Sequence, residues 1–250
     1  MSDIVTERLG NILSVQLNRP SKRNAITNEM YVILADVLEA ASRDDQVRVV
    51  LCHAAGESFS AGNDLQNFLE HPPALFGSPQ TRLIHALIDF GKPLVAAVQG
   101  VAFGVGTTLL THCDFVYAAE SAQFQLPFID LGVVPEFGSS YLLPLRSGHL
   151  RASELFLLGR PFPAREAAEI GLVTEVVPDA KLLATAIETA QALASKSPAA
   201  MRATKHLLKN LFRKRLEEAV RLEVESFAER VHSDEAKEAF RAFLTEHPSG

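Results

Sequence analysis

The carboxylate best placed to act as a base in this chain is Glu136. Its neighbours in the run Val133-Val134-Pro135-Glu136-Phe137-Gly138-Ser139-Ser140 are largely apolar. Burial beside Val134, Phe137 and Phe128 would disfavour the charged form and raise the pKa of this carboxyl group, toward a range where it can take and return a proton. The alternative is a solvated loop glutamate, because most glutamates lie at the surface.

Two glycine-bearing turns could hold the negative charge that such a base creates. They are Ser60-Ala61-Gly62-Asn63-Asp64-Leu65 and Gly104-Val105-Gly106. Each lies between an apolar strand-like run and a helix-compatible run, where backbone N–H groups have no partner within the helix. Such groups, at the positive end of a helix dipole, stabilise an oxyanion. Taken alone, the first turn is better explained as an ordinary turn with Asp64 as helix cap, and the alternative for the second turn is close backbone packing.

Other chemistry has little support in the residues. Gly104-Val105-Gly106 is followed by Leu109 and not by the third glycine of a dinucleotide-binding fingerprint. The spacing of Cys52 and Cys113 fits neither a zinc site nor a disulfide framework, so we expect two reduced thiols. His112-Cys113-Asp114 has no partner cluster at metal-ligand spacing, and we expect no metal. The nucleophile elbow of serine hydrolases, Gly-x-Ser-x-Gly, does not occur.

The composition sets outer limits on the function. The chain has 250 residues, 47% of them hydrophobic, and a net charge of −6. That suits one large domain, or one domain with an appendage. An acidic balance argues against nucleic-acid binding, although a few local cations would suffice for a small phosphorylated ligand. We expect no membrane span, because the most apolar run, 94–110, contains a glutamine and three glycines, and we expect a cytoplasmic location, because no secretory signal is recognisable.

The elements that must position these residues alternate between strands and helices. A hairpin is predicted over 4–17 and a helix from a Thr27 cap to about Arg43. Further strands are predicted at 47–53, 94–98 and 115–119. Their continuous apolar character is typical of strands covered on both faces, and the alternation indicates the α/β class.

Beyond about residue 180 the pattern predicts helices alone. They cover 182–195, a segment that begins at Ser197-Pro198, 214–231, and 233–246. An apolar stripe on the third helix must be buried against the main domain or another subunit; it consists of Leu216, Val220, Val224, Phe227 and Val231. A helical row of basic residues is predicted to be a solvated face; it consists of Arg202, Lys205, Lys209 and Arg213.

The motifs, taken in order, resemble one family over nearly the whole chain, from about residue 4 to 243. They are Arg19-Pro20-x-x-x-Asn24-Ala25, Ala61-Gly62-x-Asp64-Leu65, Gly100-x-x-x-Gly104-x-Gly106, Cys113-Asp114 and Pro135-Glu136-x-Gly138. The chain is similar to the crotonase superfamily, the enoyl-CoA hydratase/isomerase family. The resemblance implies a crotonase-like α/β spiral of ββα units over 1–190, with a C-terminal helical trimerisation region over 191–250. It also implies a homotrimer or a dimer of trimers.

The resemblance implies an acyl-CoA substrate and no separate cofactor, because CoA is part of the substrate. The thioester oxygen would lie between the backbone N–H groups of Ala61 and Val105. The loop with Lys22, Arg23 and Ala25 would lie along the CoA adenine and phosphates, although a solvated basic loop explains its cations nearly as well. The other predicted substrate-binding residues are Asp64, Leu65, Gly104 and Phe128.

Positions at which this chain departs from the family pattern limit which of the family's reactions it can catalyse. At the positions of the two glutamates that activate water in the hydratases, this chain has Thr108 and Phe128, so simple hydration is disfavoured. Glu136 falls where peroxisomal-type Δ3,Δ2-enoyl-CoA isomerases carry their catalytic glutamate. The resemblance therefore implies an isomerase of fatty acid metabolism, in which Glu136 moves a proton from C2 to C4 through a dienolate. The alternatives are another enolate reaction (hydrolysis, decarboxylation or C–C cleavage) and a non-catalytic acyl-CoA-binding protein.

Overall fold

A six-stranded sheet forms the centre of the computed structural model, which describes residues 2–72 and 77–246. The order of its strands is β1-β2-β3-β4-β6-β9. The first pair is the antiparallel hairpin, and every later pair is parallel. The strands are β1 (Ile4–Leu9), β2 (Ile12–Leu17), β3 (Val49–Ala54), β4 (Leu94–Val98), β6 (Phe115–Ala119) and β9 (Glu175–Val177). The predicted hairpin and the three predicted inner strands are confirmed.

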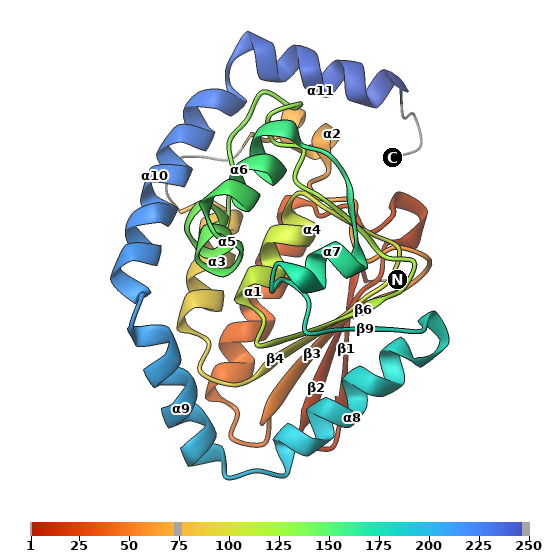
Figure 1. The fold of residues 1–250 in the computed structure, drawn as a ribbon, viewed down its shortest axis with the longest axis vertical. Coiled ribbons are helices and arrows are strands. Elements are labelled where there is room, and N and C mark those ends of the chain that lie inside the picture. Colours follow the sequence, from red (N-terminus) through yellow and green to blue (C-terminus); the bar gives the residue numbers. More distant parts are fainter. Residues whose placement is uncertain (1, 73–76, 247–250) are drawn as a thin grey trace.

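Helices cover both faces of this sheet, which explains why its inner strands are apolar throughout. Helix α1 (Asn28–Arg43) begins at the predicted cap, where the Thr27 hydroxyl accepts a hydrogen bond from the Met30 N–H. It packs against α3 (Pro79–Asp89). Figure 1 shows α8 (Leu182–Ala194) on the opposite side of the strands from these two helices, and it packs against β3, β4 and β6. The predicted α/β class is confirmed.

A second, three-stranded sheet was not predicted. It has the order β5-β7-β8, from β5 (Val101–Phe103), β7 (Gln123–Gln125) and β8 (Phe162–Pro163). These strands are only two or three residues long, so they leave no alternating pattern in the sequence. A strand of the large sheet is followed by one of the small sheet at β4-β5 and again at β6-β7, as the ββα spiral requires.

Short helices connect the sheets and surround the site. The elements not yet introduced are η1 (Pro20–Lys22), α2 (Leu65–Glu70), α4 (Val105–Thr108), η2 (Leu109–His112), α5 (Ser139–Ser147), α6 (His149–Leu158), α7 (Ala164–Glu169) and η3 (Asp179–Lys181). Within the two described ranges, no helix combines the length and the apolar character that crossing a membrane requires.

The C-terminal helices follow the prediction closely. They are α9 (Pro198–Asn210), α10 (Arg213–Val231) and α11 (Asp234–Glu246), and Figure 1 shows α9 and α10 along one side of the molecule with α11 across its end. Four members of the apolar stripe are buried and Val224 is half-buried. Since α10 packs against α5, the stripe is covered by its own chain. The predicted boundary at residue 190 falls inside α8, and the division into two units stays a prediction.

The prediction of a solvated basic row is wrong for two of its residues, Lys205 and Lys209 on α9. Lys205 is 5% exposed, and its Nζ donates to Asp114 Oδ2 and to the Lys92 carbonyl, each at 2.6 Å. Lys209 donates to three carbonyl oxygens at the end of α3, those of Leu87, Ile88 and Phe90. The last carbonyls of a helix lack partners within it, so this end needs donors from elsewhere. Helix α9 therefore lies against the core by its cationic side.

Candidate active site

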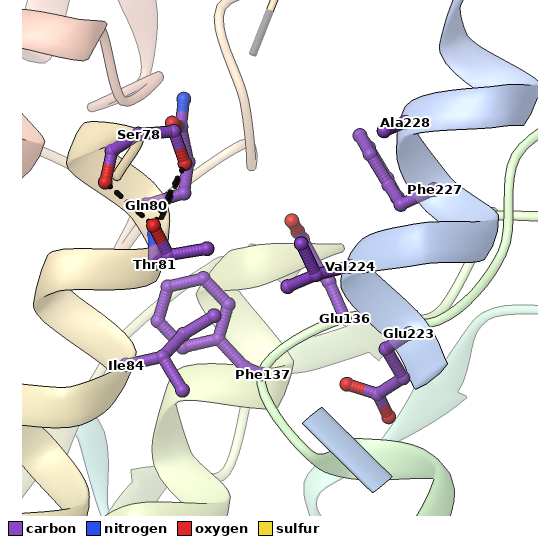
Figure 2. A pocket seen from close by; sticks show the side chains of 10 residues that line it. All are labelled: Ser78, Gln80, Thr81, Ile84, Glu136, Phe137, Glu223, Val224, Phe227 and Ala228. Carbon is purple, nitrogen blue, oxygen red and sulfur yellow. Dashed lines mark hydrogen bonds between the residues drawn. The ribbon is translucent and has the colours of Figure 1, made fainter. Parts of the chain in front are cut away.

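Glu136 lies in the wall of a cavity between α3 and α10 (Figure 2). The side chain is 7% exposed, so the alternative of a solvated loop carboxylate is excluded. The empty space of the cavity, including the part that is open to solvent, is about 410 Å³. Its lining is largely apolar on the α10 side and carries hydroxyl and amide groups at the start of α3: Ser78, Gln80, Thr81, Ile84, Glu136, Phe137, Glu223, Val224, Phe227 and Ala228. Such a cavity suits a flexible apolar group held against one reactive carboxylate.

The pKa of Glu136 is raised to about 8: burial is the main cause, a hydrogen bond from Asn63 opposes it, and the charge of Glu223 adds to it. A carboxylate with a pKa in this range can both accept and return a proton near neutrality. The expected raised pKa is therefore present. Phe128 is buried with its ring 6.4 Å from that of Phe156, and it is not part of the cavity lining. Its contact with substrate stays a prediction.

A chain of hydrogen bonds links Glu136 to the first helix. The Asn63 amide donates to Glu136 Oε1 at 3.1 Å, and the Tyr31 hydroxyl donates to Asn63 Oδ1 at 2.5 Å. Because the amide oxygen is occupied by Tyr31, the amide NH₂ is the group that faces the carboxylate. Tyr31 is fully buried, and both burial and Glu136 raise its pKa, so the phenol stays protonated. Neither residue was predicted for the site, although Asn63 stands inside the first glycine-bearing turn.

The first turn is tightly built. Gly62 has φ 98°, and a Cβ there would lie 2.9 Å from the Phe103 carbonyl oxygen. The predicted cap is confirmed, since Asp64 accepts from the Asn67 N–H that begins α2, and the same carboxylate pairs with Arg19 at 2.6 Å. These bonds assign Asp64 to holding the turn. Any contact of Asp64 or of the half-buried Leu65 with substrate stays a prediction.

The Ala61 N–H is not free in this structure. It donates to the Arg23 carbonyl oxygen at 2.9 Å. Arg23 and Asn24 have φ values of 47° and 55°, in the left-handed region, and the Asn24 amide holds this bend by donating to the carbonyls of Ala55 and Ser58. The predicted oxyanion donor and the predicted CoA-binding loop are thus in direct contact.

The second turn lies beside the first. A parallel bridge joins Ser60 to Ala102, and a Cβ on Gly106 would lie 2.8 Å from the Ser60 carbonyl oxygen. Val105 is the first residue of α4, so its N–H has no acceptor within that helix. Gly104 precedes it and donates to the Gln125 carbonyl. The two turns therefore lie in contact, while the oxyanion role of Ala61 and Val105 stays a prediction.

The predicted CoA loop spans η1 and the residues after it. Lys22 is half-buried and Arg23 is exposed, whereas Ala25 is buried with 5% of its surface exposed. Their contacts with CoA stay predictions.

A second buried carboxylate, Glu223 on α10, lines the same cavity as Glu136 and was not predicted. Burial raises its pKa to about 7, against hydrogen bonds from Ser140 and Gly138 that lower it. Its Oε2 accepts from the Gly138 N–H at 2.6 Å, and its Oε1 accepts from the Ser140 N–H at 2.8 Å. The signal that could have found it is its place on the buried stripe of α10, between Val220 and Phe227.

The hydratase positions carry no carboxylate and are closed to solvent. Thr108 is 1% exposed and Phe128 is 4% exposed. In the described ranges, no group of three or more His, Cys, Asp or Glu residues could hold a metal ion. Both cysteines are free, and burial raises the pKa of Cys52 to about 12 and that of Cys113 above its usual range. Asp114 accepts hydrogen bonds from the Leu94 N–H and from Lys205, so its role is structural.

Comparisons with known proteins find relatives over nearly the whole chain. The family model described as enoyl-CoA hydratase/isomerase matches residues 7–249. Enoyl-CoA delta isomerase 2 of Rattus norvegicus is 38% identical over 245 residues, which are 96% of this chain and 62% of that protein. The human protein of that name is 37% identical, with 97% and 63% covered. The chain thus spans less than two thirds of the length of these two relatives.

Other relatives carry hydratase names or are known as structures. The 2,3-dehydroadipyl-CoA hydratase of Escherichia coli is 34% identical, over 98% of this chain and 96% of that protein. The structure of Pseudomonas aeruginosa OdaA has a TM-score of 0.94 and 41% sequence identity, over 98% of this chain and 99% of that one.

Proposed function

Because the chain belongs to the enoyl-CoA hydratase/isomerase family, we propose that it is a Δ3,Δ2-enoyl-CoA isomerase of fatty acid metabolism. The observation that supports this most is the position of Glu136, a buried carboxylate with a raised pKa in the wall of an apolar cavity. The names of the rat and human relatives point in the same direction.

One carboxylate is sufficient for this reaction. The C2 proton of a Δ3-enoyl thioester is acidic, because its removal gives a conjugated dienolate. In the proposed mechanism Glu136 takes the proton from C2. The negative charge of the resulting dienolate is delocalised over the thioester oxygen, C2 and C4. Glu136 then returns the same proton to C4. The double bond is then between C2 and C3, and no atom is gained or lost. The pKa of about 8 lets Glu136 serve as base first and acid second.

The charge on the thioester oxygen would be held by the N–H groups of Ala61 and Val105. Preorganised backbone donors of this kind are commonly a large part of the catalytic effect. On substrate binding, the thioester oxygen must share or replace the Arg23 carbonyl as the acceptor of the Ala61 N–H. Because Arg23 belongs to the proposed CoA loop, binding of CoA could be coupled directly to release of this donor.

Simple hydration is disfavoured by the same geometry. Water addition in the hydratases of this family uses two carboxylates, whereas this chain places Thr108 and Phe128 at those positions. Both oxygens of the second buried carboxylate, Glu223, accept backbone N–H groups, so Glu223 is poorly suited to activate water. Another enolate reaction on an acyl-CoA, or acyl-CoA binding without catalysis, would be the outcome if enoyl-CoA is not isomerised.

We further propose a homotrimer or a dimer of trimers, as the family implies. An exposed row of leucines on α9 supports an interface with another subunit, because large apolar patches at a surface commonly mark such interfaces. Its members are Leu207 and Leu208, together with Leu211, which directly follows the helix. The cytoplasmic location stays a prediction.

The proposed function is tested by absorbance of the conjugated enoyl thioester after mixing the protein with a trans-3-enoyl-CoA. We expect turnover by the wild type and a loss of about 10²–10⁴-fold in Glu136→Gln, the range typical of a general base. Glu120→Gln, at an exposed position, is the matched control and should keep wild-type activity. Normal turnover by Glu136→Gln would show that another residue is the base. Binding of CoA esters in calorimetry without any turnover would favour the non-catalytic alternative.

A further inference from the structure

The turn that carries Glu136 has an unusual backbone conformation. Phe137 has φ 63° and Gly138 has φ 69°, so two consecutive residues lie in the left-handed region. Glycine adopts this conformation freely, but a bulky residue such as phenylalanine does so only where its surroundings hold it there. Glu136 immediately precedes these two residues, so the direction of its side chain depends on the conformation of the turn.

The Phe137 side of the turn is held by the core. Its ring is fully buried, with the ring centroid of Tyr31 at 6.1 Å and that of His112 at 6.4 Å. Burial lowers the pKa of His112 to about 3, so the imidazole is neutral, and its Nε2 donates to the Phe137 carbonyl at 2.7 Å. These contacts fix the carbonyl of Phe137 but leave the N–H groups after it to another partner.

That partner is Glu223. Its two oxygens accept the N–H groups of Gly138 and Ser140, which lie at the beginning of α5, where the helix dipole favours a negative charge. Figure 2 shows Glu223 on α10 beside the turn that carries Glu136. Helix α10 also packs directly against Gly138, since a Cβ at this position would lie 2.4 Å from Leu216 Cδ1. The turn therefore cannot shift without breaking both bonds to this carboxylate.

We propose that Glu223 is a positioning residue for the reaction, which holds the left-handed turn by a two-oxygen clamp on Gly138 and Ser140 and thereby directs the Glu136 carboxylate into the cavity. This inference rests on the proposed function. It gives α10, in the predicted oligomerisation region, a part in the active site.

The chemistry of the clamp is specific to glutamate. Glutamine offers one oxygen, so its NH₂ group would face a backbone N–H and one of the two bonds would be lost. Aspartate keeps the charge but is one methylene shorter, so it cannot reach both donors from the same helix position. Comparing the two substitutions therefore separates the charge of Glu223 from its reach.

The charge has a second, measurable consequence for Glu136. Tyr31 on α1, Asn63 on the first turn and the hydroxyl and amide groups at the start of α3 are the uncharged polar groups around Glu136, and among the residues that line the cavity Glu223 on α10 is the other carboxylate. Removing that charge, as in Glu223→Gln, should lower the pKa of Glu136. Shortening the side chain while keeping the charge, as in Glu223→Asp, should not. A residue that merely stabilises the fold would change neither this pKa nor the balance between kcat and KM.

The test combines ¹³C NMR titration of carboxyl-labelled glutamate with steady-state kinetics on a trans-3-enoyl-CoA. The Glu136 signal is assigned by its absence in Glu136→Gln. We expect Glu223→Gln to lower the pKa of Glu136, and to lower kcat by about 10- to 100-fold with little change in KM, because the base is misdirected. Glu223→Asp should lower kcat similarly while the pKa of Glu136 stays high. Glu229→Gln, on the exposed side of the same helix, is the matched control and should change neither quantity.

The outcomes separate this inference from the proposed function. Wild-type kcat in both Glu223 variants, with an unchanged Glu136 titration, would overturn the positioning role. A wild-type protein inert on enoyl-CoA would overturn the proposed function alone, since the NMR titration needs no substrate and still shows whether Glu223 acts on Glu136. If Glu223→Gln does not fold, Glu223→Asp keeps the buried charge and decides the question by its kcat.

Discussion

At Glu136, burial and hydrogen bonding act on one pKa in opposite directions. Burial favours the neutral acid and raises the pKa to about 8, while the Asn63 amide stabilises the charged form and limits the rise. A proton-transfer base needs this balance, because it must be ionised in the free enzyme and basic enough to remove a carbon-bound proton. Asn63 can keep the balance only while its amide is oriented, and Tyr31 provides that orientation.

The first prediction concerns the pH dependence of turnover. Glu136 is active as the carboxylate, so kcat/KM should rise with pH and level off above about 8. In Asn63→Ala the charged form loses a hydrogen bond, so the pKa of Glu136 should rise and the midpoint of the profile should move to higher pH. Activity at pH 7 would fall accordingly.

The measurement is kcat/KM on a trans-3-enoyl-CoA from pH 6 to 10, for the wild type, Asn63→Ala and the control Asn210→Ala, which is exposed on α9. A midpoint that stays in place or moves to lower pH in Asn63→Ala would contradict the role of this amide.

At the scale of elements, α9 is attached to the core by two lysines, of which Lys205 is buried and Lys209 is half-buried. Lys205 joins the beginning of β4 to Asp114, which in turn accepts from the Leu94 N–H. Lys209 supplies donors to the end of α3. Since α3 contributes one wall of the cavity, these lysines connect the C-terminal helices to the site through backbone carbonyls.

The second prediction is that Lys205→Met destabilises the fold. It leaves Asp114 without its cation and the Lys92 carbonyl without a donor, and removal of one partner of a buried pair costs about 3–5 kcal/mol. Because the Asp114 side chain is 28% exposed, the loss should lie near the lower figure. Urea unfolding at pH 7 measures it. Arg202→Met, exposed on the same helix, should change the free energy of unfolding by no more than about 0.5 kcal/mol, and an equal loss in both variants would refute the prediction.

At the scale of the whole molecule, the two buried carboxyl groups of the candidate active site reduce the stability of the fold when they are ionised. The pKa values of Glu136 and Glu223 are raised in the folded protein to about 8 and about 7, so between about pH 4.5 and 8 the folded chain binds more protons than the unfolded chain. Stability contributed by these groups is therefore fully present below their unfolded pKa and is lost as the pH rises through the folded values.

The third prediction follows from this sign. Glu136→Gln cannot ionise, so its melting temperature should exceed that of the wild type at pH 8.5 by at least about 2–4 °C, the shift that 1 kcal/mol produces in a chain of this size. At pH 5, where the wild-type carboxyl is protonated, the difference should shrink. Calorimetric scans at the two pH values, with Glu120→Gln as control, measure it. A difference that is equal at both pH values would rule out this account.

The sequence by itself determined the features that depend on near neighbours. The caps Thr27, Asp64 and Ser197 are each readable because the hydroxyl or carboxylate accepts an N–H three residues later. The inner strands are readable because burial on both faces demands an unbroken apolar run. The motif around Glu136, with Thr108 and Phe128 at the hydratase positions, was enough to propose one base and an enolate.

Only the tertiary structure decided what surrounds that base. Tyr31 reaches Asn63 across 32 positions, Asn63 reaches Glu136 across 73, and Glu223 reaches Gly138 across 85. The hydrogen bond from the Ala61 N–H to the Arg23 carbonyl likewise joins residues that are far apart in the sequence. Secondary structure depends on local periodicity, which these contacts do not alter, whereas the orientation and the pKa of a buried carboxylate depend on which distant polar groups the fold places around it.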